Sequence, residues 1–390
     1  MSKTIGILTG GGDCPGLNSV IYGVLLKAVD AGYRVIGIQK GWKGFLELRT
    51  CELDVTALDD LHTIGGTLIY TSRTNPYKAA KSIKNPEERK IAIKQTAEKL
   101  ASQFEKLGID TLVAIGGDDT LGVAAAMHKY AGAKVVGVPK TIDNDLSNTD
   151  YTFGFWSAIQ LATNAMDNIT TTARSHQRIF VVQIMGRDAG WLTLISGIST
   201  GADIILIPEK PFDLQNDILN VLKERVKAGK KYHIIACSEG AVPTEKSFNR
   251  DFTTITKNDI DKLPKDDFGN PILSKLNMSK VLCRELNKQE DLRKLFQKYE
   301  TEYDIRDVIL GHTMRAGSPN AFDRVLGVRF GVQAVKLILE KKFGRMVCLE
   351  GDNISSVPLA KGAMKKIIPK DSDLLEVADL ITSVKYNKSA

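Results

Sequence analysis

Residues 111–145 read TLVAIGGDDTLGVAAAMHKYAGAKVVGVPKTIDND and carry the clearest signal of the fold class. Short apolar runs at 111–115 and 134–138 predict buried strands, and the apolar residues between 121 and 130 have helical spacing. A strand, a helix and a second strand in this order predict two parallel strands of one sheet. Each strand runs directly into a polar turn, so we expect the two turns at the ends of neighbouring strands.

These two turns combine acidic groups with a lysine. The sequences GGDDT and PKTIDND bring Asp118, Asp119, Asp143 and Asp145 near Lys140. Carboxylates at this density repel one another and any anionic substrate unless positive charge lies among them. A divalent metal that bridges phosphate oxygens, with one Asp left over as a base, resolves this conflict. The pattern therefore favours phosphoryl transfer.

The acids allow more than one assignment. Asp118 follows a strand and is a natural Mg²⁺ ligand. One of Asp143 and Asp145 would accept the proton of a sugar hydroxyl, a contribution of about 10²- to 10⁴-fold. The other would hold the loop or a metal-bound water. The alternative is purely structural: Asp119 or Thr120 would cap the following helix, and the second turn would be held by Asx-type hydrogen bonds.

Apolar runs and helical segments alternate along much of the chain. Strands are predicted at 5–8, 35–38, 179–184, 203–206, 233–236 and 308–310, and helices at 20–28, 87–107, 157–172 and 214–228. Such alternation predicts α/β architecture with mostly parallel sheets, and 390 residues suit two domains of this kind. From 243 to 304 the chain turns polar, which predicts a mobile surface excursion with one helical stretch at 273–286.

A glycine-rich turn, TGGGDCPGLN at 9–18, follows the first strand and opens a helix. Its glycines let backbone N–H groups approach an anion, although a tight turn needs glycine in any case. The turn is neither GxGxxG nor a Walker A sequence, so a dinucleotide oxidoreductase is poorly supported. Arginines, whose planar guanidinium suits bidentate phosphate binding, recur at predicted strand ends and turns. They are Arg73, Arg178, Arg187, Arg306 and Arg315.

The composition fits a cytoplasmic enzyme that acts on small anions. The net charge of +7 comes from interspersed lysines and arginines, which argues against a nucleic-acid arm. Five scattered cysteines without a CxxC pair predict neither a structural zinc nor a disulfide framework. No apolar run approaches the roughly 20 residues that span a bilayer, and no signal peptide is evident. We expect a cytoplasmic protein with no nucleic-acid or membrane partner.

Seven segments together resemble the phosphofructokinase family. They are GGGDCPGLN at 10–18, GGDDT at 116–120, PKTIDND at 139–145, SHQR at 175–178, MGRDAG at 185–190, CSEG at 237–240 and GHTMRAGSP at 311–319, in family order. The resemblance implies two Rossmann-like α/β domains with mostly parallel sheets and the active site in the cleft between them. Residues 1–153 with about 314–364 would bind the phosphoryl donor, and 154–313 with the C-terminal tail would bind fructose 6-phosphate.

By motif position, the resemblance also implies roles for single residues. The donor would be held by Gly11, Gly12, Arg73, Gly117, Asp118, Asp119, Thr120 and Lys140, with Asp118 binding Mg²⁺. Fructose 6-phosphate would be surrounded by Thr141, Ile142, Asp143, Met185, Gly186, Arg187, Glu239, His312, Thr313, Met314 and Arg315. Asp143 would deprotonate the 1-hydroxyl, and Asp119, Lys140 and Arg187 would complete the catalytic set. Arg178 and Arg306 would reach the 6-phosphate from a neighbouring subunit, which implies a homodimer or homotetramer with shared active sites.

Two positions bear on the identity of the donor. ATP-using bacterial members of the family commonly carry glycine where this chain has Asp119 and Lys140. A carboxylate at 119 would oppose the α-phosphate of ATP by charge and bulk, and a lysine at 140 would place positive charge on the phosphate leaving group. The combination resembles the pyrophosphate-dependent branch. Because some ATP-using relatives also carry the lysine, Asp119 bears most of this assignment.

Two rival functions remain open from the sequence. One is an ATP-dependent phosphofructokinase. The other, of a different class, is a non-catalytic sugar-phosphate sensor or subunit, against which the intact set of Asp118, Asp143 and Arg187 argues. Tyr22 and Leu26 stand where allosteric bacterial members carry arginines for an effector nucleotide, so regulation of that kind is not expected.

Overall fold

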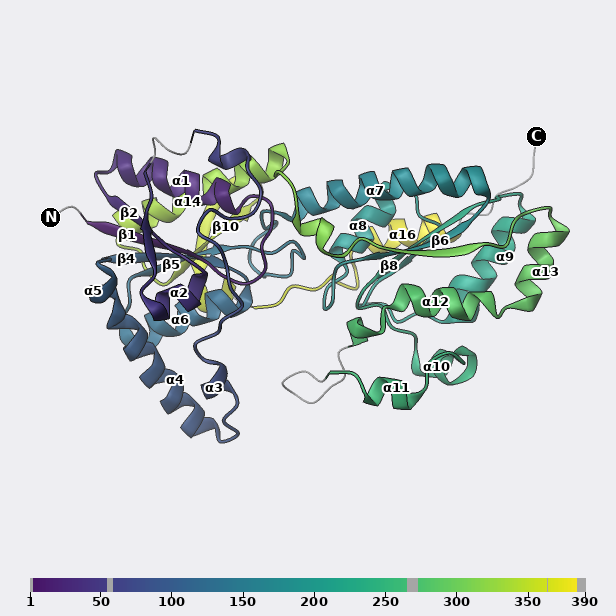
Figure 1. Cartoon of the computed structure of the whole chain (residues 1–390), viewed down its shortest axis with the longest axis horizontal. Coiled ribbons are helices and arrows are strands. Elements are labelled where there is room, and N and C mark those ends of the chain that lie inside the picture. Colours follow the sequence, from purple (N-terminus) through teal and green to yellow (C-terminus); the bar gives the residue numbers. More distant parts are fainter. Residues whose placement is uncertain (1–2, 55–58, 265–272, 363, 384–390) are drawn as a thin grey trace. The chain divides into compact units, whose positions relative to one another are not determined.

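The structure, a computed structural model, describes residues 3–54, 59–264, 273–362 and 364–383 (Figure 1). The chain divides into two compact units. One consists of Met1–Ala158 and Arg315–Lys366, and the other of Ile159–Met314 and Ile367–Ala390. The chain first passes from one unit to the other inside helix α7 (Phe155–His176). The predicted boundary at 153/154 lies just before this helix. Within the described ranges, no helix is long and apolar enough to cross a membrane.

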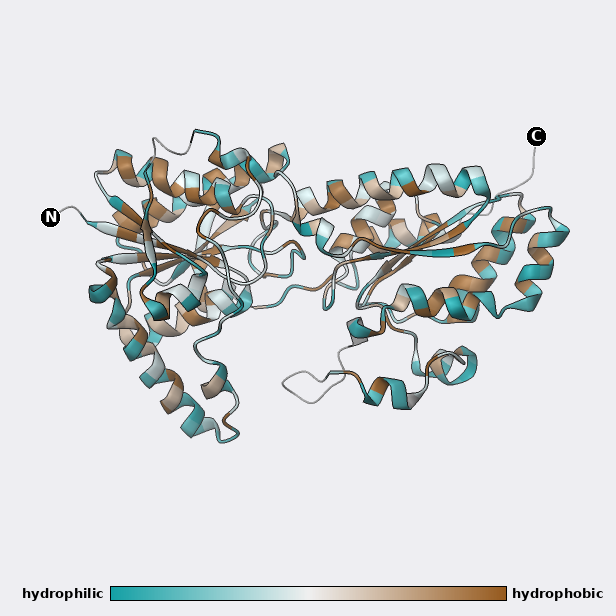
Figure 2. Ribbon diagram, viewed as in Figure 1, coloured by the Kyte–Doolittle hydropathy of each residue, from teal (hydrophilic) through white to brown (hydrophobic). Residues whose placement is uncertain are grey.

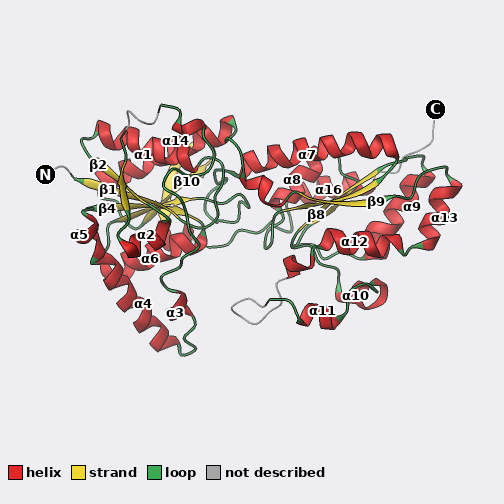
Figure 3. Ribbon diagram, in the orientation of Figure 1, coloured by secondary structure: helices red, strands yellow, loops and turns green. Residues whose placement is uncertain are grey.

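A seven-stranded sheet forms the centre of the first unit, in the order β11-β10-β5-β4-β1-β2-β3. Its strands are β1 (Thr4–Thr9), β2 (Arg34–Ile38), β3 (Thr50–Glu52), β4 (Thr111–Gly116), β5 (Val135–Pro139), β10 (Arg345–Glu350) and β11 (Asn353–Pro358). All pairings are parallel except those of the two edge strands, β3 and β11. Every residue of β1, β4 and β5 is buried, as expected for parallel strands with helices on both faces (Figure 3).

Helices α1 (Leu17–Asp30) and α14 (Ala321–Leu339) pack against each other on one face of this sheet (Figure 1). Two glycines permit their close approach. A methyl group on Gly23 would lie 2.3 Å from the carbonyl oxygen of Val328, and one on Gly331 would lie 2.3 Å from that of Val20. Since neither distance leaves room for a side chain, glycine is required at both positions.

The opposite face carries α2 (Gly41–Glu47), α4 (Pro86–Ala101) and α6 (Asp118–Ala131), and the short helices η2 (Leu61–Thr63), α3 (Lys78–Lys81), α5 (Gln103–Leu107) and α15 (Leu359–Gly362) complete the unit. The single helix predicted at 87–107 is broken at Ser102. The Ser102 hydroxyl donates to the carbonyl oxygen of Lys99 at 2.9 Å, a local bond that competes with the helical pattern. Gly108 ends α5 in the left-handed region, with φ 63°.

The second unit contains a four-stranded parallel sheet in the order β7-β8-β6-β9. The strands are β6 (Ile179–Ile184), β7 (Ile204–Leu206), β8 (His233–Ser238) and β9 (Ile305–Ile309). Helices α7, α8 (Trp191–Ser199) and α16 (Asp373–Ser383) cover one face, and α9 (Asn220–Lys227), preceded by the π-helical turn η3 (Leu214–Leu219), lies on the other (Figure 1). The predicted α/β architecture with mostly parallel sheets is thus confirmed in both units.

The prediction of a surface excursion with a single helix at 243–304 is wrong for the part that the structure describes, which excludes 265–272. The helices there are α10 (Glu245–Asp251), α11 (Lys257–Asp261), η4 (Leu273–Leu276), α12 (Met278–Asn287) and α13 (Glu290–Lys298). Leu282, Leu286 and Phe296 are fully buried, in one core with Val181 of β6 and Ile235 of β8. These helices form one wall of the second unit.

The composition of this segment explains the difference between the predicted and the observed structure. Helix α12 carries hydrophilic and hydrophobic residues in alternation, whereas the strands of the sheet are mostly hydrophobic (Figure 2). An amphipathic helix hides a narrow apolar stripe inside a sequence whose average is polar. Polar anchors strengthen the contact: the Gln183 side chain accepts hydrogen bonds from the backbone and hydroxyl of Ser279, both at 3.2 Å.

We therefore expect Phe296→Ala to destabilise the protein strongly. The ring is fully buried and contacts the rings of His233 and Tyr303, at centroid distances of 5.8 and 5.2 Å. Truncation should lower the free energy of unfolding by about 3–5 kcal/mol, measured by denaturant unfolding. Lys294→Ala, on the exposed side of the same helix, is the matched control. If both variants unfolded at the same denaturant concentration, the conclusion that this helix forms part of the core of the second unit would be wrong.

Candidate active site

Three turns meet at one edge of the sheet in the first unit. Strands β1, β4 and β5 are parallel neighbours, with Thr9 paired to Ile115 and Gly116 to Pro139. The Gly10 N–H donates to the carbonyl oxygen of Ile115 at 2.9 Å, which extends this pairing into the turn. The turns GGDDT and PKTIDND therefore leave the sheet side by side, as the sequence predicts, and the glycine-rich turn lies next to GGDDT.

The glycine-rich turn is fastened to the segment that carries Arg73. Gly11 has φ 85°; its N–H donates to the carbonyl oxygen of Ser72 and its carbonyl accepts from the Thr71 hydroxyl, both at 2.9 Å. Arg73 itself is exposed. These bonds therefore hold the backbone segment that carries Arg73 next to the glycines.

Two cations lie against the glycine-rich turn. A methyl group on Gly11 would lie 3.5 Å from Nζ of Lys140, and one on Gly12 would lie 2.8 Å from a terminal nitrogen of Arg315. Arg315 also donates to the carbonyl oxygen of Asp13 at 3.1 Å. Arg315, assigned to the sugar by resemblance, thus lies with the donor residues in the first unit.

Lys140 is almost completely buried, at 4% exposure. Burial is the main cause that lowers the pKa of its ammonium group, and the charge of Arg315 lowers it further. The carboxylates of Asp143 and Asp145 act in the opposite direction. An ammonium group in this setting is poorly hydrated, so its charge acts strongly on any neighbouring anion.

Asp118 and Asp119 occupy the first turn of α6, which begins three residues earlier than the predicted 121. Gly117 is the N-cap and no side chain caps the helix, so the capping alternative for Asp119 and Thr120 is not realised. Thr120 is buried; a methyl group on Gly10 or Gly116 would approach its side chain to 2.4 or 2.3 Å. Thr120 therefore fills the space between the two turns.

Asp119 has two partners that the sequence did not reveal. Its Oδ1 accepts hydrogen bonds from the Asn75 amide and from Nζ of Lys81, each at 2.9 Å. Its side chain is 69% exposed, so the two bonds orient the carboxylate but contribute little to stability. The ammonium group of Lys81 also offsets part of its charge.

The second acidic turn is held by its own hydrogen bonds. The Asp143 N–H donates to the Thr141 hydroxyl at 3.0 Å, and the Thr141 carbonyl accepts from the Thr152 hydroxyl at 2.7 Å. Asn144, at φ 51°, accepts from the Thr152 N–H at 3.2 Å. The side chain of Ile142 is fully buried, so only its backbone is available to a substrate.

A divalent metal fits this edge as a partner of two carboxylates. Burial raises the pKa of Asp145, and the nearby negative charge of Asp118 raises it further. Among the described residues, no group of three or more His, Cys, Asp or Glu side chains could hold an ion. Mg²⁺ suits such a sparse site, because it keeps several waters and takes further ligands from substrate phosphates.

The sugar-site candidates of the second unit gather at the carboxyl ends of its strands. Met185, Gly186 and Arg187 follow β6, Glu239 follows β8, and His312, Thr313 and Met314 follow β9. The Glu239 N–H donates to the carbonyl oxygen of Ile184 at 2.9 Å, and the Met185 N–H donates to Sδ of the buried Met314 at 3.4 Å. A methyl group on Gly240 would lie 1.9 Å from the Arg187 carbonyl oxygen, so these turns are tightly packed.

Arg187 and His312 are exposed at this edge. The Arg187 guanidinium pairs with the neighbouring Asp188, at 3.0 Å between Nη2 and Oδ2. An exposed ion pair of this kind contributes little to stability and is readily exchanged for an anionic ligand. The edge thus offers a cation, a carboxylate and an imidazole to a sugar phosphate.

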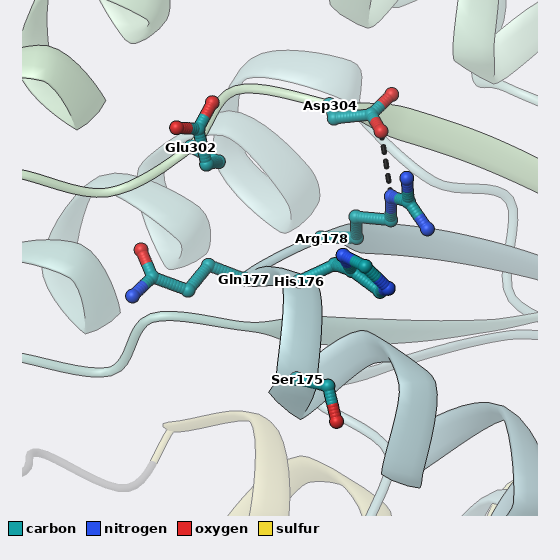
Figure 4. Close-up of a pocket in the computed structure, with 6 residues that line it drawn as sticks. All are labelled: Ser175, His176, Gln177, Arg178, Glu302 and Asp304. Carbon is teal, nitrogen blue, oxygen red and sulfur yellow. Dashed lines mark hydrogen bonds and ion pairs between the residues drawn. The ribbon is translucent and has the colours of Figure 1, made fainter.

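Arg178 and Arg306 do not belong to that edge. Arg178 precedes β6, and Arg306 lies near the start of β9, paired with Phe180. The six residues of β6, at about 3.3 Å each, put Arg178 on the order of 20 Å from Met185. It lines a cavity of about 410 Å³ with Ser175, His176, Gln177, Glu302 and Asp304, which Figure 4 shows.

Comparison with known proteins places this arrangement in a family. Residues 4–338 match the phosphofructokinase family. The chain is 41% identical over 362 residues to pyrophosphate–fructose 6-phosphate 1-phosphotransferase of Streptomyces coelicolor, covering 93% of this chain and 94% of the relative. It is 42% identical over 369 residues to ATP-dependent 6-phosphofructokinase 2 of the same organism, covering 94% and 97%.

The fold is also that of the solved pyrophosphate-dependent phosphofructokinase from Marinobacter aquaeolei, with a TM-score of 0.72, 20% identity and coverage of 98% of this chain and 92% of that one. Close relatives carry names with both donors, so similarity over the whole chain does not separate pyrophosphate from ATP. Together with the acidic and glycine-rich turns at the sheet edge, these matches show that the chain belongs to the phosphofructokinase family, a family of phosphotransferases.

Proposed function

We propose that this protein transfers a phosphoryl group from pyrophosphate to the 1-hydroxyl of fructose 6-phosphate, with Mg²⁺. The observation that carries the donor assignment is the position of Asp119, held by Asn75 and Lys81 at the start of α6. Pyrophosphate and the product bisphosphate are comparable phosphoryl donors, so the reaction should run in both directions, in glycolysis or its reversal. The five free cysteines support a reducing, cytoplasmic location.

Asp119 would exclude ATP by occupying space as well as by charge. If the carboxylate swung aside it would lose its bonds to Asn75 and Lys81, each of which contributes little at this exposure. Lys81 offsets part of the charge of Asp119. The paired carboxylate would therefore repel the α-phosphate of ATP less strongly than an isolated carboxylate would. Pyrophosphate, which has no group beyond its second phosphate, would not need that space.

Lys140 would supply the positive charge that the leaving phosphate needs. Its buried ammonium group lies next to Gly11, and Arg315 lies next to Gly12. Preorganised charge in a site of low polarity stabilises developing negative charge without reorganisation. Asp118 and Asp145 would hold Mg²⁺, which neutralises phosphate charge when bound.

Asp143 would accept the proton of the 1-hydroxyl. The hydrogen bond from its N–H to Thr141, and those that Asn144 makes across the turn, restrict where its carboxylate can lie. A base held in this way needs little conformational rearrangement before it accepts the proton.

An oligomer would complete the sugar site. Arg178 and Arg306 lie at the opposite end of their own sheet from Met185, Arg187 and Glu239. If they bind the 6-phosphate, as the resemblance implies, they would do so for another subunit. This supports a homodimer or homotetramer with shared active sites.

The rival that deserves a direct test is an ATP-dependent phosphofructokinase, because a relative of that name is 42% identical. Initial rates with pyrophosphate, ATP and ADP, at the same Mg²⁺ and fructose 6-phosphate, separate the two donors. A non-catalytic sensor would show no turnover with any of them.

For the donor, Asp119→Gly should admit ATP. Removal of charge and bulk near the α-phosphate should raise kcat/KM for ATP by roughly ten- to several-hundred-fold. Asp119→Asn keeps the bulk and removes the charge, so its smaller gain would measure the charge alone. If the wild type already prefers ATP, or folded Asp119→Gly still does not use it, the exclusion argument fails.

For the base, Asp143→Asn should lower kcat by roughly 10²-fold or more, because the amide cannot accept the proton. The KM for fructose 6-phosphate should change little, since the backbone of the turn is unaltered. Steady-state kinetics measure both values. A variant with nearly wild-type kcat would remove Asp143 from the mechanism.

For the shared site, Arg178→Ala and Asp143→Asn should complement each other. Each variant alone lacks a different part of every site, whereas a mixed oligomer contains some sites with both parts intact. Mixing the two after dissociation should restore part of the activity at limiting fructose 6-phosphate. An active monomer, seen by light scattering at assay concentration, would rule out shared sites.

A further inference from the structure

A single carboxylate bridges two arginines at the amino-terminal end of the sheet in the second unit. Oδ2 of Asp304 accepts from Nε of Arg178 at 2.6 Å, the contact drawn in Figure 4. The other oxygen, Oδ1, forms an ion pair with Nε of Arg306 at 2.9 Å, and Oδ2 also accepts a hydrogen bond from Nη2 of Arg306 at 3.2 Å. One acid thus contacts two guanidinium groups, and Arg178 and Asp304 also line the cavity.

The sheet register builds this cluster. Ile179 pairs with Ile305, and the Ile179 N–H donates to the Asp304 carbonyl at 3.0 Å, so Arg178 and Asp304 stand at the starts of adjacent strands. Arg306 is two residues after Asp304, and alternate residues of a strand point to the same face. The three side chains are therefore placed together by backbone pairing.

The electrostatics favour this arrangement. Two guanidinium groups repel each other, and the carboxylate between them offsets that repulsion. Burial alone would raise the pKa of Asp304, but hydrogen bonds from Arg178 and Arg306 outweigh it and lower that pKa. Asp304 consequently stays ionised at neutral pH, and the trio keeps one net positive charge.

The contacts with Asp304 leave N–H groups of the two arginines available to bind a ligand. Within the described residues, Arg178 is bonded through its inner nitrogen, Nε, which leaves its two terminal amino groups for another acceptor. A phosphate dianion suits such groups, because it accepts bidentate hydrogen bonds from guanidinium. Arg178 is 28% exposed and Arg306 is 58% exposed, so a ligand has access to both.

We propose that Asp304 is a positioning residue: it sets Arg178 and Arg306 as a preformed pair for the phosphate monoester of the sugar substrate. It touches the arginines and not the substrate. The inference rests on the proposed role of these arginines at the 6-phosphate, but not on which phosphoryl donor the enzyme uses.

The test compares Asp304→Ala, Asp304→Glu and the control Glu302→Ala. Glu302 lines the same cavity but, in the described structure, forms no ion pair with either arginine. Loss of a charged partner should raise the KM for fructose 6-phosphate roughly 10- to 100-fold in Asp304→Ala, with kcat within about threefold of wild type. Asp304→Glu should recover part of the loss, and Glu302→Ala should behave as wild type.

Two further measurements test the role of Asp304 independently of the identity of the phosphoryl donor. Calorimetric affinity for fructose 6-phosphate, measured on the intact oligomer without donor, should fall in Asp304→Ala by the same factor as KM rises, whichever donor is used. Mixing Asp304→Ala with Asp143→Asn should then yield sites with wild-type KM. An unchanged KM and affinity, equal losses in Asp304→Glu and Asp304→Ala, or a fall in kcat with no change in KM would overturn the positioning role.

Discussion

Parallel pairing of β1, β4 and β5 is the constraint on which the proposed donor site depends. Parallel strands end at the same edge of a sheet, so three turns that are far apart in the sequence become neighbours. The sheet interior is apolar and buried, which leaves the turns as the only part of these elements that can carry charge. The glycines of the first turn and the cations Lys140 and Arg315 then face a common space.

In the second unit the direction of the strands separates the candidate residues instead of bringing all of them together. Groups that follow β6, β8 and β9 collect at one end, while Arg178 and Arg306, at the start of their strands, stay at the other. No local adjustment of side chains moves a residue along a paired strand. A chain that needs all of these groups around one sugar phosphate must therefore obtain some of them from another copy.

The sequence predicted the elements whose signal is local and missed those whose signal is tertiary. Strand β6 has the predicted bounds, because a buried parallel strand is a continuous apolar run. The sequence did not predict that helices α12 and α13 pack into the core, because each has a narrow apolar stripe and a larger polar outer face. The partners of Asp119 could not be foreseen: Lys81 lies 38 residues away in the chain, and no pattern links the two. The bridge of Asp304 likewise depends on strand register.

The exposure of Asp119 bears on how the donor preference that we propose for this residue can change over evolutionary time. Its side chain lies on the surface of α6 and takes no part in the hydrophobic core, so its replacement costs the folded state little. A lineage can therefore alter the residue at this position without compensating changes elsewhere in the sheet. If Asp119 selects the donor, as we propose, selectivity and foldability are separable traits in such an architecture.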